Sequence, residues 1–221
     1  GIDGDRSSFK SDFPKINGCF RNKSIEDAVM KGLFFAKQDQ PILFVGPDGC
    51  GKTQIAKWVG DIVSENGSNM MVCTPETTIA DLIGNFVPVP NQKTSSLLPV
   101  KWTDGPIVRS VIDGKCIILD QIECALPQYI ERINPLLDSY AKINTYKNVS
   151  FTINERPTNN KIKIKNGFKF IATASKMQLN KLSPALLNRL SVINIENQFH
   201  KRESSKLFNN LFSAVSNQFN I

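Results

Sequence analysis

The stretch Gly46-Pro47-Asp48-Gly49-Cys50-Gly51-Lys52-Thr53 decides the fold of this chain. It fits the pattern G-x-x-x-x-G-K-[ST] at every fixed position, and it stands between an apolar run over 41–45 and a run of helical spacing over 52–64. Glycines let the backbone form a concave nest of N–H groups, and the start of the following helix adds partial positive charge. The motif therefore predicts a loop that binds the phosphates of a nucleoside triphosphate.

The side chains of this loop explain the chemistry that the motif predicts. Lys52 can reach the terminal phosphates, and the Thr53 hydroxyl can ligate Mg²⁺. A simple glycine turn before a helix is the competing interpretation, but the complete motif in its strand–helix context argues against it. We expect all of residues 46–53 to contribute to the binding of ATP with Mg²⁺.

Five short apolar runs predict the strands of one sheet. They are Ile42–Val45, Met70–Cys73, Cys116–Leu119, Phe168–Ala172 and Val192–Ile195. Apolar runs without alternation indicate strands that are buried on both faces of a parallel sheet. Helix-like stretches separate them, the first with Ser24 as its expected N-cap. The predicted fold is α/β, a parallel five-stranded sheet flanked by helices, with the phosphate loop at the carboxyl edge of the strands.

Residues 140–165 have the pattern of a β-hairpin. Apolar residues alternate at Val149, Phe151 and Ile153 and again at Ile162 and Ile164, and the other face carries Lys161, Lys163 and Lys165. A ribbon that binds nucleic acid is one interpretation of these lysines. A solvated hairpin face is favoured, because no aromatic residues are interleaved with them.

Composition limits the class of protein. Of the 221 residues 41% are hydrophobic and 21% are charged, which is typical of a globular domain, and no apolar run is long enough to span a membrane. The five cysteines form no CxxC pair and indicate reduced thiols in an intracellular protein. His200 is the only histidine, which argues against a histidine-based metal site or catalytic triad.

A second element completes the predicted nucleotide site. The apolar run 116–119 delivers Asp120 to the sheet edge, where its carboxylate can hold Mg²⁺ through water. In hydrolytic enzymes of this kind a glutamate usually follows and activates the attacking water, but the next residue here is Gln121. An amide can orient water but cannot accept its proton. Glu123 follows two residues later, and its direction depends on the local turn. The sequence therefore supports triphosphate binding better than hydrolysis.

Several further stretches resemble the AAA+ modules of the dynein-related, midasin-like family. They are TPETTIADLIGNFVPV (74–89), WTDGPIVRSVIDGKCIILDQIECALPQYIERINPLLD (102–138), FTINER (151–156), GFKFIATAS (167–175) and LSPALLNRL (182–190). With the phosphate loop they cover about residues 24–196 in the family's order and spacing. The resemblance implies an AAA+ core over 24–198 with an inserted β-hairpin, an irregular segment over 1–23, and a C-terminal helix over 199–221 that begins a mostly absent helical lid.

The resemblance also implies roles for single residues. Asp120 matches the acid of the Walker B strand, and Ser175 stands at the sensor 1 position, which usually carries asparagine. Arg189 matches the arginine finger, which acts on nucleotide held by the neighbouring module of a ring. An arginine that caps the carbonyl groups of a helix end is the alternative. The catalytic candidates are therefore Gln121, Glu123, Ser175 and Arg189, and Pro135 is expected to interrupt a helix that is usually continuous.

Three functions remain open at this stage. The first is a motor module of a midasin-like ring ATPase, which would act with neighbouring modules and pre-ribosomal particles in the nucleus or nucleolus to release assembly factors from large ribosomal subunits. The second, favoured by Gln121, is a module that holds ATP but hydrolyses it weakly or not at all. The third is a nucleic-acid remodeller, which the net charge of +7 and the hairpin lysines support. A GTPase is set aside, because the nearest base-reading string, over 22–25, lacks its aspartate and precedes the phosphate loop.

Overall fold

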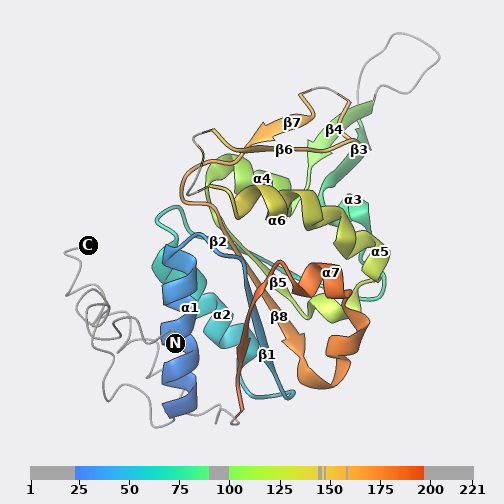
Figure 1. The fold of residues 1–221 in the computed structure, drawn as a ribbon. Coiled ribbons are helices and arrows are strands. Elements are labelled where there is room, and N and C mark those ends of the chain that lie inside the picture. The colour runs from blue at the N-terminus through green and yellow to red at the C-terminus, as the bar shows by residue number, and fades with distance from the viewer. Residues whose placement is uncertain (1–22, 90–99, 144–145, 147, 158, 197–221) are drawn as a thin grey trace.

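The fold is that of a computed structural model, which describes residues 23–89, 100–143, 146, 148–157 and 159–196. Its centre is a parallel five-stranded sheet with the strand order β2-β5-β8-β1-β9 (Figure 1). The strands are β1 (Ile42–Gly46), β2 (Ser68–Val72), β5 (Cys116–Asp120), β8 (Lys169–Ser175) and β9 (Ser191–Asn194). All five predicted strands are confirmed, as is the parallel α/β class, and only their bounds shift by a few residues.

Both faces of the inner strands β1, β5 and β8 are buried, which explains why these strands consist mostly of apolar residues. Successive residues of one strand belong to different cores: Leu43 and Val45 pack in one, and Ile42 and Phe44 pack in the other. The helices α1 (Lys23–Lys37) and α2 (Lys52–Val63) cover the face of Ile42 and Phe44. The opposite face is covered by α4 (Pro106–Asp113), α6 (Asn134–Tyr140) and the short helix α3 (Ile79–Leu82) (Figure 1).

Local sequence signals set most of the helix bounds. Helix α2 starts at Lys52, directly after Gly51 of the phosphate loop, and ends at Val63, before Gly67 in the left-handed region at a φ of 85°. The expectation that Ser24 caps α1 is wrong, since the helix already begins at Lys23 and includes Ser24. The interruption expected at Pro135 is confirmed. The chain after Asp120 is broken into η2 (Ile122–Cys124), α5 (Pro127–Ile130), η3 (Glu131–Ile133) and α6, and Pro135 lies in the first turn of α6.

Two antiparallel hairpins extend from the core. The predicted one is confirmed as β6 (Ser150–Thr152) paired with β7 (Lys161–Lys163). A second, formed by β3 (Gly84–Pro88) and β4 (Val100–Asp104), was not expected. Its cross-strand pair Phe86 and Trp102 packs edge to face at 5.3 Å between ring centroids. The predicted segments 1–23 and 199–221 lie outside the described residues, apart from Lys23.

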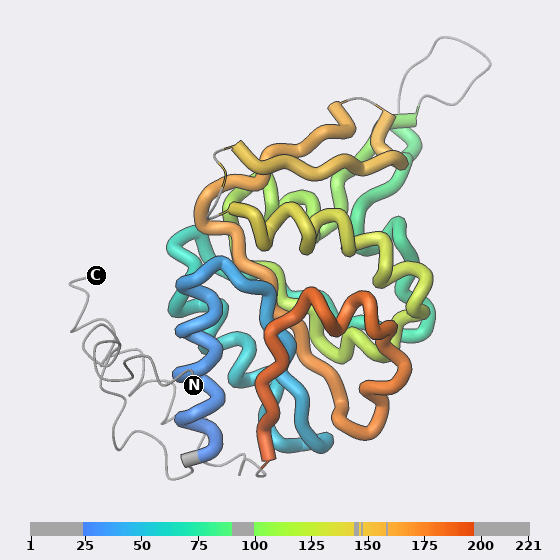
Figure 2. Tube along the Cα trace, in the orientation of Figure 1, coloured from blue at the N-terminus to red at the C-terminus, as the bar shows by residue number. Residues whose placement is uncertain are grey.

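Because the strands are parallel, the loops that follow them lie at one edge of the sheet, and the loops that precede them lie at the opposite edge. Here an edge means the side where the strands begin or end. The carboxyl ends of β1, β5 and β8 meet at the end of the sheet that carries the phosphate loop (Figure 2). The strand register pairs Gly46 with Ser175. The hairpin β6–β7 and the end of α4 precede β8 and β5, so they lie at the opposite edge. The short elements η4 (Lys176–Lys181) and α7 (Pro184–Leu187) connect β8 to β9. No helix in the described ranges is long and apolar enough to cross a membrane.

The interior strand β5, between β2 and β8, offers a direct test of this packing. Ile118 is fully buried, and a Cβ added at Gly60 of α2 would lie 3.0 Å from its Cδ1, so helix and strand are in close contact there. We expect Ile118→Ala to lower the free energy of unfolding by about 2–5 kcal/mol, since a cavity remains. Val192→Ala, on the edge strand with 41% of Val192 exposed, should cost less than about 1 kcal/mol. Urea denaturation followed by circular dichroism measures both, and equal losses would contradict the described core.

Candidate functional site

The phosphate loop has the backbone that its glycines predict. Gly49 and Gly51 adopt left-handed φ angles of 78° and 90°, and α2 starts at the next residue. Gly46 is required for a different reason, because an added Cβ would lie 2.7 Å from both the Cys50 Sγ and the Ile195 carbonyl oxygen. The first N–H groups of α2 have no partner within the helix and are available to an anion in the loop.

Lys52 lies over the loop. Only 8% of it is exposed, and its Nζ donates to the carbonyl oxygens of Gly46 at 3.1 Å and Pro47 at 2.9 Å. A longer contact of 3.5 Å reaches the carboxylate of Asp48, which is mostly exposed. The ammonium group is therefore fixed at the loop by neutral carbonyls, which phosphate oxygens can replace with stronger, charge-assisted hydrogen bonds.

Asp120 connects three elements at the carboxyl edge of the sheet. Its side chain is 5% exposed, and its Oδ1 accepts hydrogen bonds of 2.7 Å from the hydroxyls of Thr53 and of Thr173. The loop and the Walker B strand are thus brought together as predicted. The carboxylate of Asp120 and the hydroxyl of Thr53 form a set of hard oxygen donors that fits Mg²⁺. The described residues contain no cluster of three or more histidine, cysteine or acidic side chains that could hold a metal ion.

Thr173 is a site residue that the sequence analysis missed. It is fully buried in β8, and its Oγ1 also accepts a hydrogen bond of 3.0 Å from the backbone N–H of Gln121. One hydroxyl therefore positions both the Asp120 carboxylate and the start of the turn that follows it. A threonine within the apolar run FIATA was the signal that could have identified this residue, because a buried hydroxyl needs partners.

The turn after Asp120 separates the two candidates for water activation. Gln121 has a left-handed φ of 56°, unusual for a residue with a side chain, and its side chain is exposed. Glu123 is instead buried, with 3% exposed, and its Oε1 accepts a hydrogen bond of 2.7 Å from the backbone N–H of Ser175. The turn therefore directs the glutamate inward and the glutamine outward.

Glu123 and Ser175 each have one side-chain oxygen without a hydrogen-bond partner in the part of the chain that the structure describes. They are Oε2 of Glu123 and Oγ of Ser175, and both are buried. A buried polar atom without a partner costs about 1–3 kcal/mol, so such atoms usually have a water or a functional role to explain them. Because Ser175 adjoins Gly46 in the sheet register, both atoms lie at the edge that carries the phosphate loop.

Burial keeps the thiols of Cys50 and Cys73 protonated, and a protonated thiol is a poor nucleophile. Burial, helped by the nearby Cys124, Asp120 and Glu123, raises the pKa of the Cys73 thiol to about 12. Burial also raises the pKa of the Cys50 thiol within the phosphate loop. The four cysteines in the described ranges are free, so none of them is part of a disulfide.

Arg189 is partly exposed and held by its own module. Its Nε and Nη2 donate to the two carboxylate oxygens of Asp138 in α6, at 2.7 and 3.1 Å, and its Nη1 donates to the carbonyl oxygen of Ala185 at 2.6 Å. The hydrogen bonds to Asp138 raise the pKa of the guanidinium. The contact with Ala185 is the helix-end capping given above as the alternative. The contact with a neighbouring module's nucleotide stays a prediction.

Comparisons with known proteins agree with this geometry. Residues 41–190, more than half of the 221, match the family model described as AAA domain (dynein-related subfamily). Protein NorQ of Paracoccus denitrificans is 31% identical over 105 residues, which is 47% of this chain and 35% of that protein. An uncharacterised protein of Staphylococcus aureus strain USA300 is 27% identical over 169 residues, covering 75% of this chain and 58% of its own. The chain thus spans only part of the length of these relatives.

Solved structures support the fold. A structure described as a putative ATPase from Cytophaga hutchinsonii superposes with a TM-score of 0.50 at 19% identity, over 89% of this chain and 56% of that one. NtrX from Brucella abortus, solved in complex with ATP, superposes with a TM-score of 0.52 at 14% identity, over 91% of this chain and 44% of that one. None of these relatives bears on ribosome assembly, so the midasin-like role stays a prediction. The match over 41–190, together with the site geometry, shows that the chain belongs to the dynein-related subfamily of AAA domains.

Proposed function

We propose that this chain is an ATP-binding module of a ring-forming AAA+ protein, and that its own ATP turnover is slow. The observation that carries the proposal is the cluster in which Asp120 accepts hydrogen bonds from Thr53 and Thr173 directly beside the phosphate loop. Thr53 and Asp120 would hold Mg²⁺, directly or through water, and the metal would neutralise charge on the phosphate oxygens. Lys52 and the N–H groups of the loop would bind the phosphates themselves.

Slow turnover follows from the turn after Asp120. Gln121 stands where related hydrolytic modules carry their glutamate, and an exposed amide accepts no proton. The carboxylate of Glu123 is the better placed group, because its Oε2 is buried, without a partner among the described residues, and next to Ser175. We propose that Glu123 Oε2 and Ser175 Oγ hold the attacking water between them.

The proposed reaction is a direct transfer to water. The oxygen of the water attacks the γ-phosphorus, and the bond from that phosphorus to the bridging oxygen breaks, which leaves ADP and phosphate. The proton of the water passes to Glu123. General bases of this kind contribute about 10²- to 10⁴-fold to a rate. One oxygen of Glu123 is already used by the Ser175 N–H, so the carboxylate has little freedom to adjust, and this restraint is consistent with a low rate.

Assembly into a ring would complete the site. AAA+ proteins typically form rings, and an arginine offered to a neighbour's nucleotide stabilises the charge of the transferred phosphoryl group. In our proposal Arg189 has this role, and it must exchange its two hydrogen bonds to Asp138 for bonds to phosphate oxygens. The pair with Asp138 would then keep the guanidinium oriented until a neighbour is bound.

The role of the whole protein is a finer proposal. Release of assembly factors from precursor large ribosomal subunits, in the nucleus or nucleolus, rests on the midasin-like stretches over 74–89 and 102–138. Remodelling of a nucleic-acid complex rests on the net charge of +7. The full-length reading frame separates these proposals, since six tandem modules followed by a MIDAS domain would support the first.

Removal of the Lys52 ammonium tests nucleotide binding. We expect Lys52→Ala to weaken binding of a fluorescent ATP analogue, and of the matching ADP analogue, by at least about tenfold, because a charge-assisted contact to phosphate is lost. Lys57→Ala is the control, since Lys57 lies on the same helix, one turn after the loop, and is exposed. If Lys52→Ala binds both analogues as tightly as the wild type does, the proposed nucleotide binding is wrong.

A pair of reciprocal substitutions tests the assignment of the base. Glu123→Gln should lower steady-state phosphate release by about a hundredfold and leave ATP affinity nearly unchanged, whereas Gln121→Glu should raise turnover. Glu131→Gln, an exposed change of the same chemistry a few residues later, should have no effect.

Two results would contradict this assignment. One is a wild-type rate equal to that of Gln121→Glu, which would mean that turnover is not limited by the missing glutamate. The other is a Glu123→Gln variant that binds and hydrolyses ATP like the wild type.

A further inference from the structure

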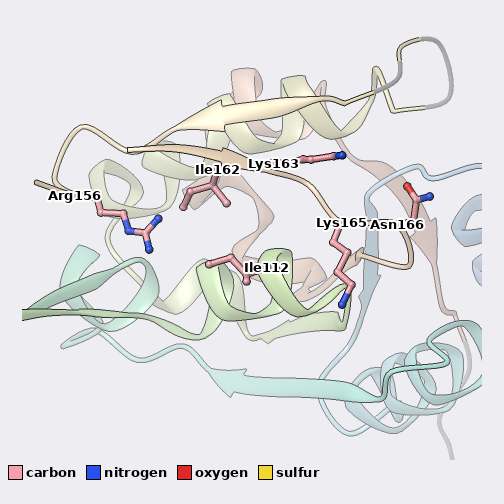
Figure 3. A pocket seen from close by; sticks show the side chains of 6 residues that line it. All are labelled: Ile112, Arg156, Ile162, Lys163, Lys165 and Asn166. Carbon is pink, nitrogen blue, oxygen red and sulfur yellow. The ribbon is translucent and has the colours of Figure 1, made fainter. Parts of the chain in front are cut away.

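A groove of about 520 Å³ lies between α4 and the hairpin β6–β7 (Figure 3). It is lined by Ile112, Arg156, Ile162, Lys163, Lys165 and Asn166. Its volume is within the range of ligand-binding pockets, about 300–1,000 Å³. The groove lies at the edge of the sheet opposite the phosphate loop, because α4 and the hairpin precede the starts of β5 and β8. The nucleotide site therefore does not explain it.

Two contacts fix the walls of this groove relative to each other. The backbone N–H of Lys165 donates to the carbonyl oxygen of Val111 in α4 at 3.2 Å. The Nη2 of Arg156 donates to the carboxylate of Asp104, at the end of β4, at 3.0 Å, and both side chains are about four-fifths buried. Because the hairpin is connected to α4 and to β4, the groove is formed before any partner binds, which lowers the entropic cost of binding.

The unpaired positive charge of the groove comes from two lysines, because Arg156 is already paired with Asp104. Lys163 and Lys165 are exposed, and neither makes an ion pair with a described residue. The acidic residues next to the lining residues are already engaged, since Asp113 pairs with Lys115 at 3.4 Å and Glu155 pairs with Arg132. The two lysines can therefore attract an anionic partner.

The middle of the groove is apolar. Figure 3 shows Ile112 of α4 and Ile162 of β7 between Arg156 at one end and Lys165 with Asn166 at the other. Ile112 is 41% exposed, so a partner that covers it gains hydrophobic contact. None of the described residues that line the groove is aromatic. Single-stranded RNA is usually recognised through stacking on aromatic residues, so this lining favours a peptide over RNA.

We propose that this groove binds an acidic peptide segment of a partner protein, with an aliphatic side chain on Ile112 and carboxylates at Lys163 and Lys165. The Asn166 amide can donate to or accept from the peptide backbone. This interaction is independent of the proposed nucleotide function, because its residues are at the other edge of the sheet. It would give the module a docking surface that remains accessible while ATP is bound.

A fluorescein-labelled peptide in which glutamates flank a central leucine tests the proposal by fluorescence anisotropy on the whole chain. We expect binding that weakens as salt rises, and that is lost when glutamines replace the glutamates. Lys163→Glu and Lys165→Glu should each weaken binding by at least about tenfold. Ile112→Asn should weaken binding of the leucine peptide but not of the same peptide with serine at the centre.

Lys161→Glu is the matched control. It lies on the same strand, is exposed and unpaired among the described residues, changes the net charge equally, and does not line the groove. We expect less than about a twofold effect from it. Equal losses for Lys161→Glu and Lys163→Glu would overturn the proposal, because they would show a diffuse attraction to the whole surface.

Tighter binding of a single-stranded RNA that depends on Lys165 would overturn the proposal in favour of nucleic acid. Melting temperature and ATP affinity confirm that each variant is folded, and Lys163→Gln with Lys165→Gln repeats the test without charge reversal.

Discussion

The carboxylate of Asp120 is almost completely buried and accepts hydrogen bonds from the hydroxyls of Thr53 and Thr173. A buried carboxylate is costly unless it is hydrogen-bonded, so these bonds are a condition for placing an acid at this position. They also join the start of α2, the end of β5 and the middle of β8. The phosphate loop is thereby held next to the acid that would share its metal, and the other features of the site are arranged around this junction.

Thr173 also positions the turn that carries Gln121 and Glu123, the two candidates for water activation. Its hydroxyl also accepts from the N–H of Gln121, which enters the next turn with a left-handed φ. That turn exposes Gln121 and buries Glu123 against the end of β8. In the proposed mechanism nucleotide binding and nucleotide turnover therefore depend on different side chains, and a change at position 121 would alter turnover while the metal and phosphate contacts remain.

The opposite edge of the sheet carries the hairpin β6–β7 with its exposed lysines. The hairpin β6–β7 is fixed to α4 and β4 by a backbone hydrogen bond and a partly buried ion pair, and it presents lysines without acidic partners among the described residues. The strands of the central sheet run from this edge to the nucleotide edge. A partner bound at one edge would therefore contact elements that lead directly into β5 and β8, the strands that carry Asp120 and Ser175.

The sequence predicted what depends on short-range pattern and missed what depends on long-range contacts. Short apolar runs identified all five sheet strands, and for β1, β5 and β8 burial on both faces removes the need for polar alternation. The β3–β4 hairpin escaped notice, since Phe86 and Val87 are half exposed and do not alternate with polar residues. The inward direction of Glu123 depends on one φ angle at Gln121. The pairing of Arg189 with Asp138 joins residues 51 positions apart, which no local pattern reveals.

The Mg²⁺ dependence of ATP affinity tests the central role of Asp120 most directly. Calorimetry with and without EDTA should show that wild-type protein binds ATP at least about tenfold more tightly with Mg²⁺ present. Asp120→Asn should lose that gain and keep the affinity measured in EDTA, because the loop and Lys52 remain. An Asp120→Asn variant that retains the full gain from Mg²⁺ would contradict the account.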